Sequence, residues 1–104
     1  MTFDLLIKHG TVIDGTGAPG IAADVGIRGG RITALASALT GSAAHEIDAT
    51  GRVVAPGFID VHTHSDFTLL TAPGANSKVR QGITTEVVGN CGFSPAPVSP
   101  QTLG

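Results

Sequence analysis

Pro56 to Asp66 reads PGFIDVHTHSD, an apolar strand that ends in two histidines spaced one residue apart, and it is the most informative stretch of the chain. Side chains of a strand alternate between its two faces, so Asp60, His62 and His64 are expected to point the same way. Same-face neighbours lie about 7 Å apart along a strand, and imidazoles that lean inward can close that gap to reach one ion. Because zinc takes four ligands, the stretch predicts half of a metal site.

The two acidic residues of this stretch have different expected roles. Asp60 lies one step deeper on the same face, and two roles stay open for it. Its carboxylate can accept a hydrogen bond from a ligand ring N–H and fix the tautomer, or it can be a structural acid satisfied by backbone donors. Asp66 is expected to belong to the following loop, where it caps the loop or faces a substrate.

A second strand is expected at residues 83–88, which read ITTEVV and are rich in β-branched side chains. A loop over 65–74 and a short helix over 76–81 precede it, with Asn76 as the helix cap and Gly82 as the stop. The order of strand, short helix and strand predicts a βαβ unit with parallel strands.

Cys91 follows this second strand, at the same end at which the histidines follow the first. Parallel pairing would bring its thiol close to the imidazoles, and Gly89 and Gly92 permit a tight ligand loop. Thiolates bind zinc well, but an isolated cysteine is also a common packing residue, so both roles stay open on spacing alone. The other two histidines, His9 and His45, lie next to turns and are expected at the surface.

The first half of the chain is expected to form short strands joined by turns. Hairpins are predicted where glycine permits positive φ, and one further turn follows. The hairpin turns are His9-Gly10, between residues 5–8 and 11–14, and Gly29-Gly30, between 24–28 and 31–35; the last turn is Ala49-Thr50-Gly51, between 46–48 and 52–54.

Composition excludes several classes of protein. The chain has 104 residues, of which 41% are hydrophobic and 13% charged, as expected of a folding sequence. A net charge of −2 favours neither nucleic acid nor an anionic membrane as a partner. No apolar run approaches the roughly 20 residues that cross a bilayer, and no basic segment resembles a signal peptide. We therefore expect a cytoplasmic protein.

Residues 56–66 resemble the first barrel strand of the amidohydrolase superfamily. Residues 78–97, KVRQGITTEVVGNCGFSPAP, resemble the N-acyl-D-amino-acid deacylases (D-aminoacylases), and residues 1–55 resemble the small β-rich domain that precedes the barrel in that family. The resemblance implies a fold of mixed α/β and β class. It comprises a β-sandwich-like domain over 1–55 and, over 56–104, the first two strands of a metal-dependent (β/α)8 TIM barrel.

The resemblance also implies a chemistry. His62 and His64 match the superfamily's paired histidine ligands, and Cys91 matches the cysteine that D-aminoacylases use to bind zinc. The implied reaction is zinc-dependent hydrolysis of the amide bond of a small-molecule N-acyl-D-amino acid, which releases a carboxylate and the free D-amino acid. The family's further histidine ligands and its catalytic aspartate lie on later strands, so no catalytic residue is expected within this chain.

Chain length sets a further expectation. A (β/α)8 barrel takes about 250 residues, so the chain is expected to be the N-terminal part of a longer enzyme, inactive alone and poorly soluble or oligomeric. Two alternatives stay open: a dihydroorotase-like or hydantoinase-like cyclic amidase, and a noncatalytic β-domain that binds a partner or a metal. The preferred acyl group and D-amino acid, the number of metals and the oligomeric state depend on residues outside this sequence.

Overall fold

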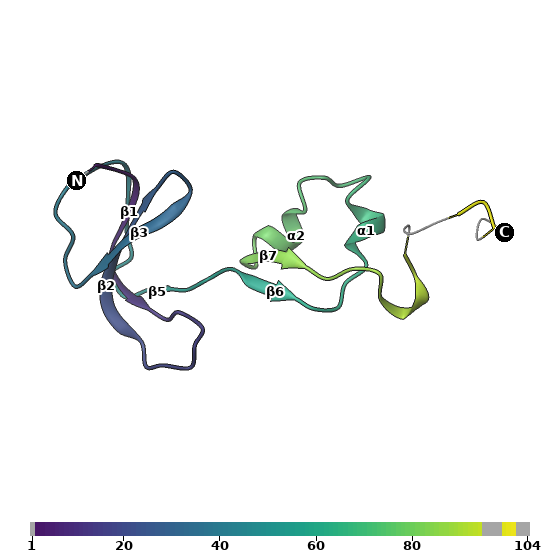
Figure 1. Ribbon diagram of the computed structural model, residues 1–104, viewed down its shortest axis with the longest axis horizontal. Coiled ribbons are helices and arrows are strands. Elements are labelled where there is room, and N and C mark those ends of the chain that lie inside the picture. The colour runs from purple at the N-terminus through teal and green to yellow at the C-terminus, as the bar shows by residue number, and fades with distance from the viewer. Residues whose placement is uncertain (1, 95–98, 102–104) are drawn as a thin grey trace. The chain divides into compact units, whose positions relative to one another are not determined.

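The computed structural model describes residues 2–94 and 99–101. The chain divides into two compact units, Met1–Pro56 and Gly57–Gly104, each of which is described by itself (Figure 1). No helix among the described residues is long and apolar enough to span a bilayer.

The first unit is built on a five-stranded sheet in the order β3-β2-β1-β4, with β5 also paired to β1. Its central strand, β1, runs antiparallel to β2 and parallel to β4 and β5. The side chains of Phe3, Leu6 and Val25 form much of its core, each at most 4% exposed. The strands are β1 (Thr2–Val12), β2 (Ile21–Arg28), β3 (Arg31–Ala36), β4 (Ser42–Asp48) and β5 (Val53–Val54).

The predicted hairpin at Gly29-Gly30 is confirmed. The two glycines have φ of 58° and 70°, and they join the antiparallel strands β2 and β3. Both central residues of this tight turn need positive φ, which glycine adopts without steric cost. The expectation that His9 and His45 are exposed is also confirmed.

The predicted hairpin at His9-Gly10 is wrong, because β1 continues through both residues. Its register with β2 shifts between Ile7 and Gly10, which marks a bulge, and His9 has a φ of 62°. The His9 N–H donates to the carboxylate of Asp24 at 2.9 Å, and the N–H of Leu39 donates to the same carboxylate at 2.9 Å. These two bonds, Leu39 first, lower the pKa of Asp24. A buried carboxylate thus satisfies the bulged backbone, which the local sequence does not reveal.

The turn at Ala49-Thr50-Gly51 forms as predicted, and the strands on either side of it both pair with β1. The Ala49 N–H donates to the carbonyl of Lys8 at 2.8 Å, and the Thr11 N–H donates to the carbonyl of Arg52 at 3.0 Å. Asp48 holds the turn closed, because its carboxylate accepts hydrogen bonds from the Thr50 N–H at 3.0 Å and the Thr50 hydroxyl at 2.6 Å.

The second unit contains two parallel strands, as predicted, β6 (Phe58–Asp60) and β7 (Ile83–Glu86). Two single-turn helices, α1 (Ser65–Thr68) and α2 (Asn76–Val79), lie between them in the sequence, and a 3-10 turn, η1 (Asn90–Gly92), follows β7.

Several predicted details of this unit are wrong. Residues 65–68 were expected in a loop and form α1, while α2 ends two residues earlier than predicted. The cap of α2 is Ala75, with a φ of 43°, because the N–H groups of Lys78 and Val79 both donate to the Ala75 carbonyl. Asn76 is therefore already inside the first turn. Gly82 has a φ of 79° and follows the helix as predicted.

The apolar run over residues 58–61 is typical of a strand covered on both faces, and within the described residues the strand does not have this cover. Phe58 is 64% exposed and Ile59 is 63% exposed. The apolar strand has a single described hydrogen-bonding neighbour, β7. Burial of such side chains needs layers on both sides of a sheet. A continuous apolar run does not indicate which parts of a protein form those layers.

Asp48→Asn is expected to reduce the loss of unfolding free energy that occurs when the pH is lowered. Hydrogen bonds from Thr50 and His9 lower the pKa of Asp48 to about 2, whereas an unfolded aspartate titrates near 3.9. The stabilisation is therefore complete above about pH 4 and is lost as the pH falls through 2. We expect the free energy of unfolding in urea, followed by circular dichroism, to fall less between pH 6 and pH 2.5 in the variant. Equal losses in the two proteins would contradict this assignment.

Candidate metal centre

The histidine segment, residues 62–65, lies just beyond β6. The Val87 N–H donates to the carbonyl of Asp60 at 2.8 Å, and the Thr63 N–H donates to the carbonyl of Val87 at 3.3 Å. The segment therefore stays beside the chain that leaves β7, although regular strand structure has ended at Asp60. His62 and His64 are both exposed, and the intervening Thr63 is only 7% exposed.

A run of left-handed backbone brings Cys91 back toward these histidines. Gly89, Cys91 and Gly92 have φ of 82°, 58° and 73°, so the tight loop expected from the two glycines is confirmed. The side-chain amide of Asn90 donates to the carbonyl of Val87 at 2.9 Å and to that of Thr63 at 3.2 Å. Asn90 thus ties the cysteine loop to the backbone between the two histidines.

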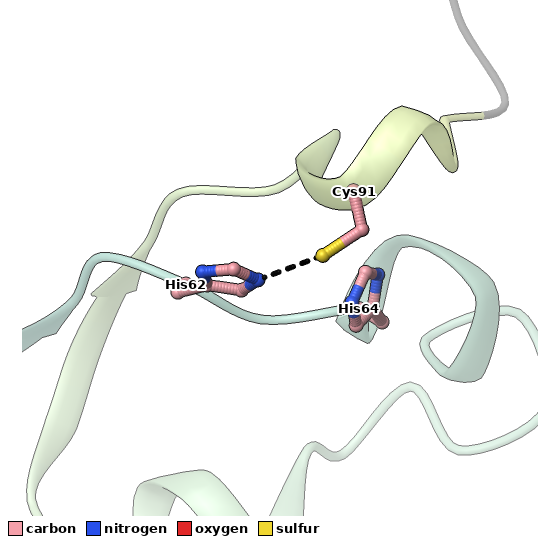
Figure 2. A group of neighbouring side chains, drawn as sticks. All are labelled: His62, His64 and Cys91. Carbon is pink, nitrogen blue, oxygen red and sulfur yellow. Dashed lines mark hydrogen bonds between the residues drawn. The ribbon is translucent and has the colours of Figure 1, made fainter.

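The three predicted ligand residues meet in one cluster. Figure 2 shows the ring of His62 facing the thiol of Cys91, with His64 beside them. The His62 Nε2 atom lies 3.2 Å from the Cys91 Sγ atom, and one ligand atom from each of the three residues lies within 4.8 Å of the others. Ligand atoms of tetrahedral zinc with one thiolate stand about 3.5 Å apart. The three ligand atoms therefore lie close enough together to be candidates for one zinc site.

An aromatic wall borders the cluster. The ring of Phe93 packs edge-on against His64, with ring centroids 6.2 Å apart. The His64 and His62 rings are also edge-on, at 5.8 Å. Phe67 joins His64 and Phe93 around a hollow of about 260 Å³.

Asp60 lies beside the cluster and is bonded to other groups. One carboxylate oxygen accepts from the Lys78 ammonium at 2.5 Å, and the other accepts from the backbone N–H of His62 at 3.2 Å. The Lys78 bond is the main cause of the lowered pKa of Asp60. Among the hydrogen bonds of residues 2–94, none joins Asp60 to a histidine ring, so its predicted role in fixing a ring tautomer stays a prediction.

Four polar residues of this unit have surroundings that sequence reasoning missed. Asn90, Lys78 and Glu86 take part in bonds that hold the histidine segment. Asp66 lies in the first turn of α1, and within the described part of the chain both its carboxylate oxygens are buried without a partner. Glu86 could have been recognised from the sequence, because it is the one charged residue in the β-branched stretch 83–88. A charged side chain in a strand that is expected to be buried needs a partner.

Known proteins match nearly the whole chain. The sequence profile of the amidohydrolase family matches residues 45–100. A D-aminoacylase from Alcaligenes xylosoxydans xylosoxydans is 53% identical over 98 residues, which are 93% of this chain and 20% of that protein. The chain therefore belongs to the amidohydrolase family. Within that family it belongs to the D-aminoacylase group.

Two solved structures extend the comparison. An N-acyl-D-glutamate deacylase from Bordetella bronchiseptica, complexed with zinc and a phosphonate mimic of the tetrahedral intermediate, matches with a TM-score of 0.86 and 50% identity over 94% of this chain and 21% of that one. A D-hydantoinase matches less closely, with a TM-score of 0.61 and 38% identity over 81% of this chain and 19% of that one. The chain spans about a fifth of the length of these relatives.

Replacing Cys91 by glycine is expected to give a more stable metal-free chain than replacing it by alanine. An L-residue in the left-handed region costs about 1–2 kcal/mol, from which the greater unfolded freedom of glycine subtracts about 0.4–1 kcal/mol. The glycine variant should therefore be more stable by roughly 0.5–1 kcal/mol. Urea unfolding followed by NMR signals of residues 58–92 measures the difference. An alanine variant of equal or greater stability would show that the Cys91 backbone is not strained.

Proposed function

We propose that this chain carries part of the zinc site of an N-acyl-D-amino-acid deacylase, with His62, His64 and Cys91 as ligands. The observation that carries the proposal is that ligand atoms of these three residues lie within 4.8 Å of one another, where two parallel strands end side by side. Membership of the D-aminoacylase group supports the choice of metal and of reaction, since a zinc-bound N-acyl-D-glutamate deacylase is among its close structural relatives.

The ligand set suits a catalytic metal. Two imidazoles and one thiolate are three protein ligands, and catalytic zinc sites keep a fourth position for water or substrate. All three side chains are exposed within the described structure, so that position is open to a small molecule. A bound zinc ion supplies Lewis acidity toward an amide carbonyl and toward water.

The residues around the ligands hold them in place during such a reaction. Asn90 keeps the Cys91 loop against the histidine segment, and the Phe93 ring contacts the His64 ring edge-on. The substrate proposed is an N-acyl-D-amino acid, which is hydrolysed to a carboxylate and the D-amino acid. The aspartate that handles the proton is proposed to lie outside this sequence, as are further histidine ligands.

The same proposal assigns the architecture. Residues 56–104 would begin a (β/α)8 barrel, with β6 and β7 as its first two strands, and residues 1–55 would belong to a β-sandwich-like domain. Two observations support the barrel. The strands β6 and β7 are parallel, and the apolar side chains of Phe58 and Ile59 are exposed, as expected of barrel strands whose further neighbours would cover both faces. We propose a cytoplasmic location for the protein.

Cobalt(II) titration of the chain tests the ligand set. We expect Co²⁺ to bind and to give a near-ultraviolet thiolate charge-transfer band. Added Zn²⁺ should displace the Co²⁺ and remove the band. Cys91→Ser should abolish the band, and His62→Ala or His64→Ala should weaken binding by more than the roughly 10–100-fold that loss of a supporting hydrogen bond costs. The exposed His45 offers a matched control, since His45→Ala should leave the affinity unchanged. A band that survives Cys91→Ser would contradict the assignment.

Activity is tested on the polypeptide encoded by the whole open reading frame that contains this sequence. We expect zinc-dependent hydrolysis of N-acetyl-D-amino acids, lost in Cys91→Ala, and no turnover by the 104-residue chain alone. Hydrolysis of hydantoins or dihydropyrimidines in preference to N-acetyl-D-amino acids would favour the cyclic-amidase alternative. If the whole polypeptide hydrolysed none of these substrates, the noncatalytic alternative would be favoured.

A further inference from the structure

A polar network lies directly beneath the histidine segment, centred on Lys78 of α2. The Lys78 ammonium contacts one carboxylate oxygen of Asp60 at 2.5 Å and one of Glu86 at 3.3 Å, and it donates to the Thr63 hydroxyl at 3.0 Å. The side chains of Lys78, Asp60 and Glu86 are 25%, 23% and 15% exposed. A single cation therefore joins both strand ends and the segment between the two histidines.

Lys78 is needed at this position because the strands place two acids together. Asp60 and Glu86 are register partners across β6 and β7, and like charges directly opposite one another destabilise a sheet. The Lys78 ammonium lies in contact with both carboxylates, which raises the pKa of Lys78 and lowers that of Asp60. Without this cation, the two strand ends would carry an unbalanced pair of carboxylates.

The network reaches the candidate ligands through alternate residues of the segment. Thr63 and Ser65 are 7% and 6% exposed, and their hydroxyls lie 3.0 Å apart. The Ser65 hydroxyl donates to Glu86 at 2.9 Å. The backbone N–H of His62 donates to Asp60. The residues on either side of His64, and the backbone of His62, are thus bonded into the network while both imidazoles remain exposed.

We propose that Lys78 is a positioning residue for the candidate metal centre, which fixes the segment from His62 to Ser65 by joining Asp60, Glu86 and Thr63. The proposal rests on the function proposed above. Three bonds of the network, Lys78 to Thr63, Thr63 to Ser65 and Ser65 to Glu86, hold the two side chains on either side of His64. The network therefore sets where the histidine backbone lies. The three charged side chains are only partly exposed, so loss of the ammonium would leave two carboxylates side by side at the strand ends and remove one of the contacts that hold Thr63.

The first test compares Lys78→Met, which keeps the length of the side chain and removes its charge, with Arg80→Met at the residue that follows the same short helix. Arg80 is exposed and takes no part in this network. Co²⁺ affinity of the chain should fall by roughly 10–100-fold in Lys78→Met, as for loss of a supporting partner of a metal ligand, and should stay unchanged in Arg80→Met. Lys78→Arg, which retains a cation and several donors, should recover part of the affinity. Equal affinities of the Lys78→Met and wild-type chains would overturn the proposal.

The second test needs no metal and therefore separates this proposal from the proposed function. Backbone amide exchange and ¹⁵N order parameters of residues 62–65 are measured in the metal-free chain. Lys78→Met should speed exchange and lower the order parameters of this segment, while the sheet of the first unit stays unchanged. A wild-type chain that binds no Co²⁺ would overturn the zinc proposal, but the exchange measurement would still test whether Lys78 positions residues 62–65. If residues 62–65 exchanged at the wild-type rate in Lys78→Met, Lys78 would not position the segment.

Discussion

The parallel pairing of β6 with β7 is the constraint on which the candidate metal centre depends (Figure 1). Parallel strands end at the same edge of a sheet, so the residues that follow each strand are brought together although they lie far apart in sequence. His62 follows β6 and Cys91 follows β7, and their ring nitrogen and sulfur atoms come within 3.2 Å. In an antiparallel pair, the same two residues would lie at opposite edges.

The same pairing places two carboxylates next to each other, and a lysine of the second unit balances their charge. Asp60 and Glu86 become direct neighbours when the strands align, and the ammonium of Lys78 contacts both carboxylates. The helix between the strands therefore has an electrostatic role in addition to joining them. Hydroxyl groups at Thr63 and Ser65 extend this network to the histidine segment, so that charge balance and ligand placement share the same few contacts.

Much of the second unit could be predicted because its signals are local. Alternation within a strand, β-branched residues at 83–86 and glycine at position 82 give the parallel unit and the place of the helix before β7, although α2 ends at Val79 and not at residue 81. The cap of α2 was mispredicted because the backbone carbonyl of Ala75 accepts the first helical bonds, a role that any residue can fill. The bulge at His9 was missed for a related reason: the carboxylate that satisfies it comes from Asp24, on another strand.

The sequence by itself determined the family, the candidate ligands and the order of strand, helix and strand, because spacing and residue type carry that information directly. Only the tertiary structure decided which atoms meet. It placed the thiol of Cys91 beside His62, bonded Asp60 to Lys78, and made β4 and β5 parallel partners of β1. These contacts join residues distant in sequence, and their geometry follows from strand register and backbone path, which no local pattern specifies.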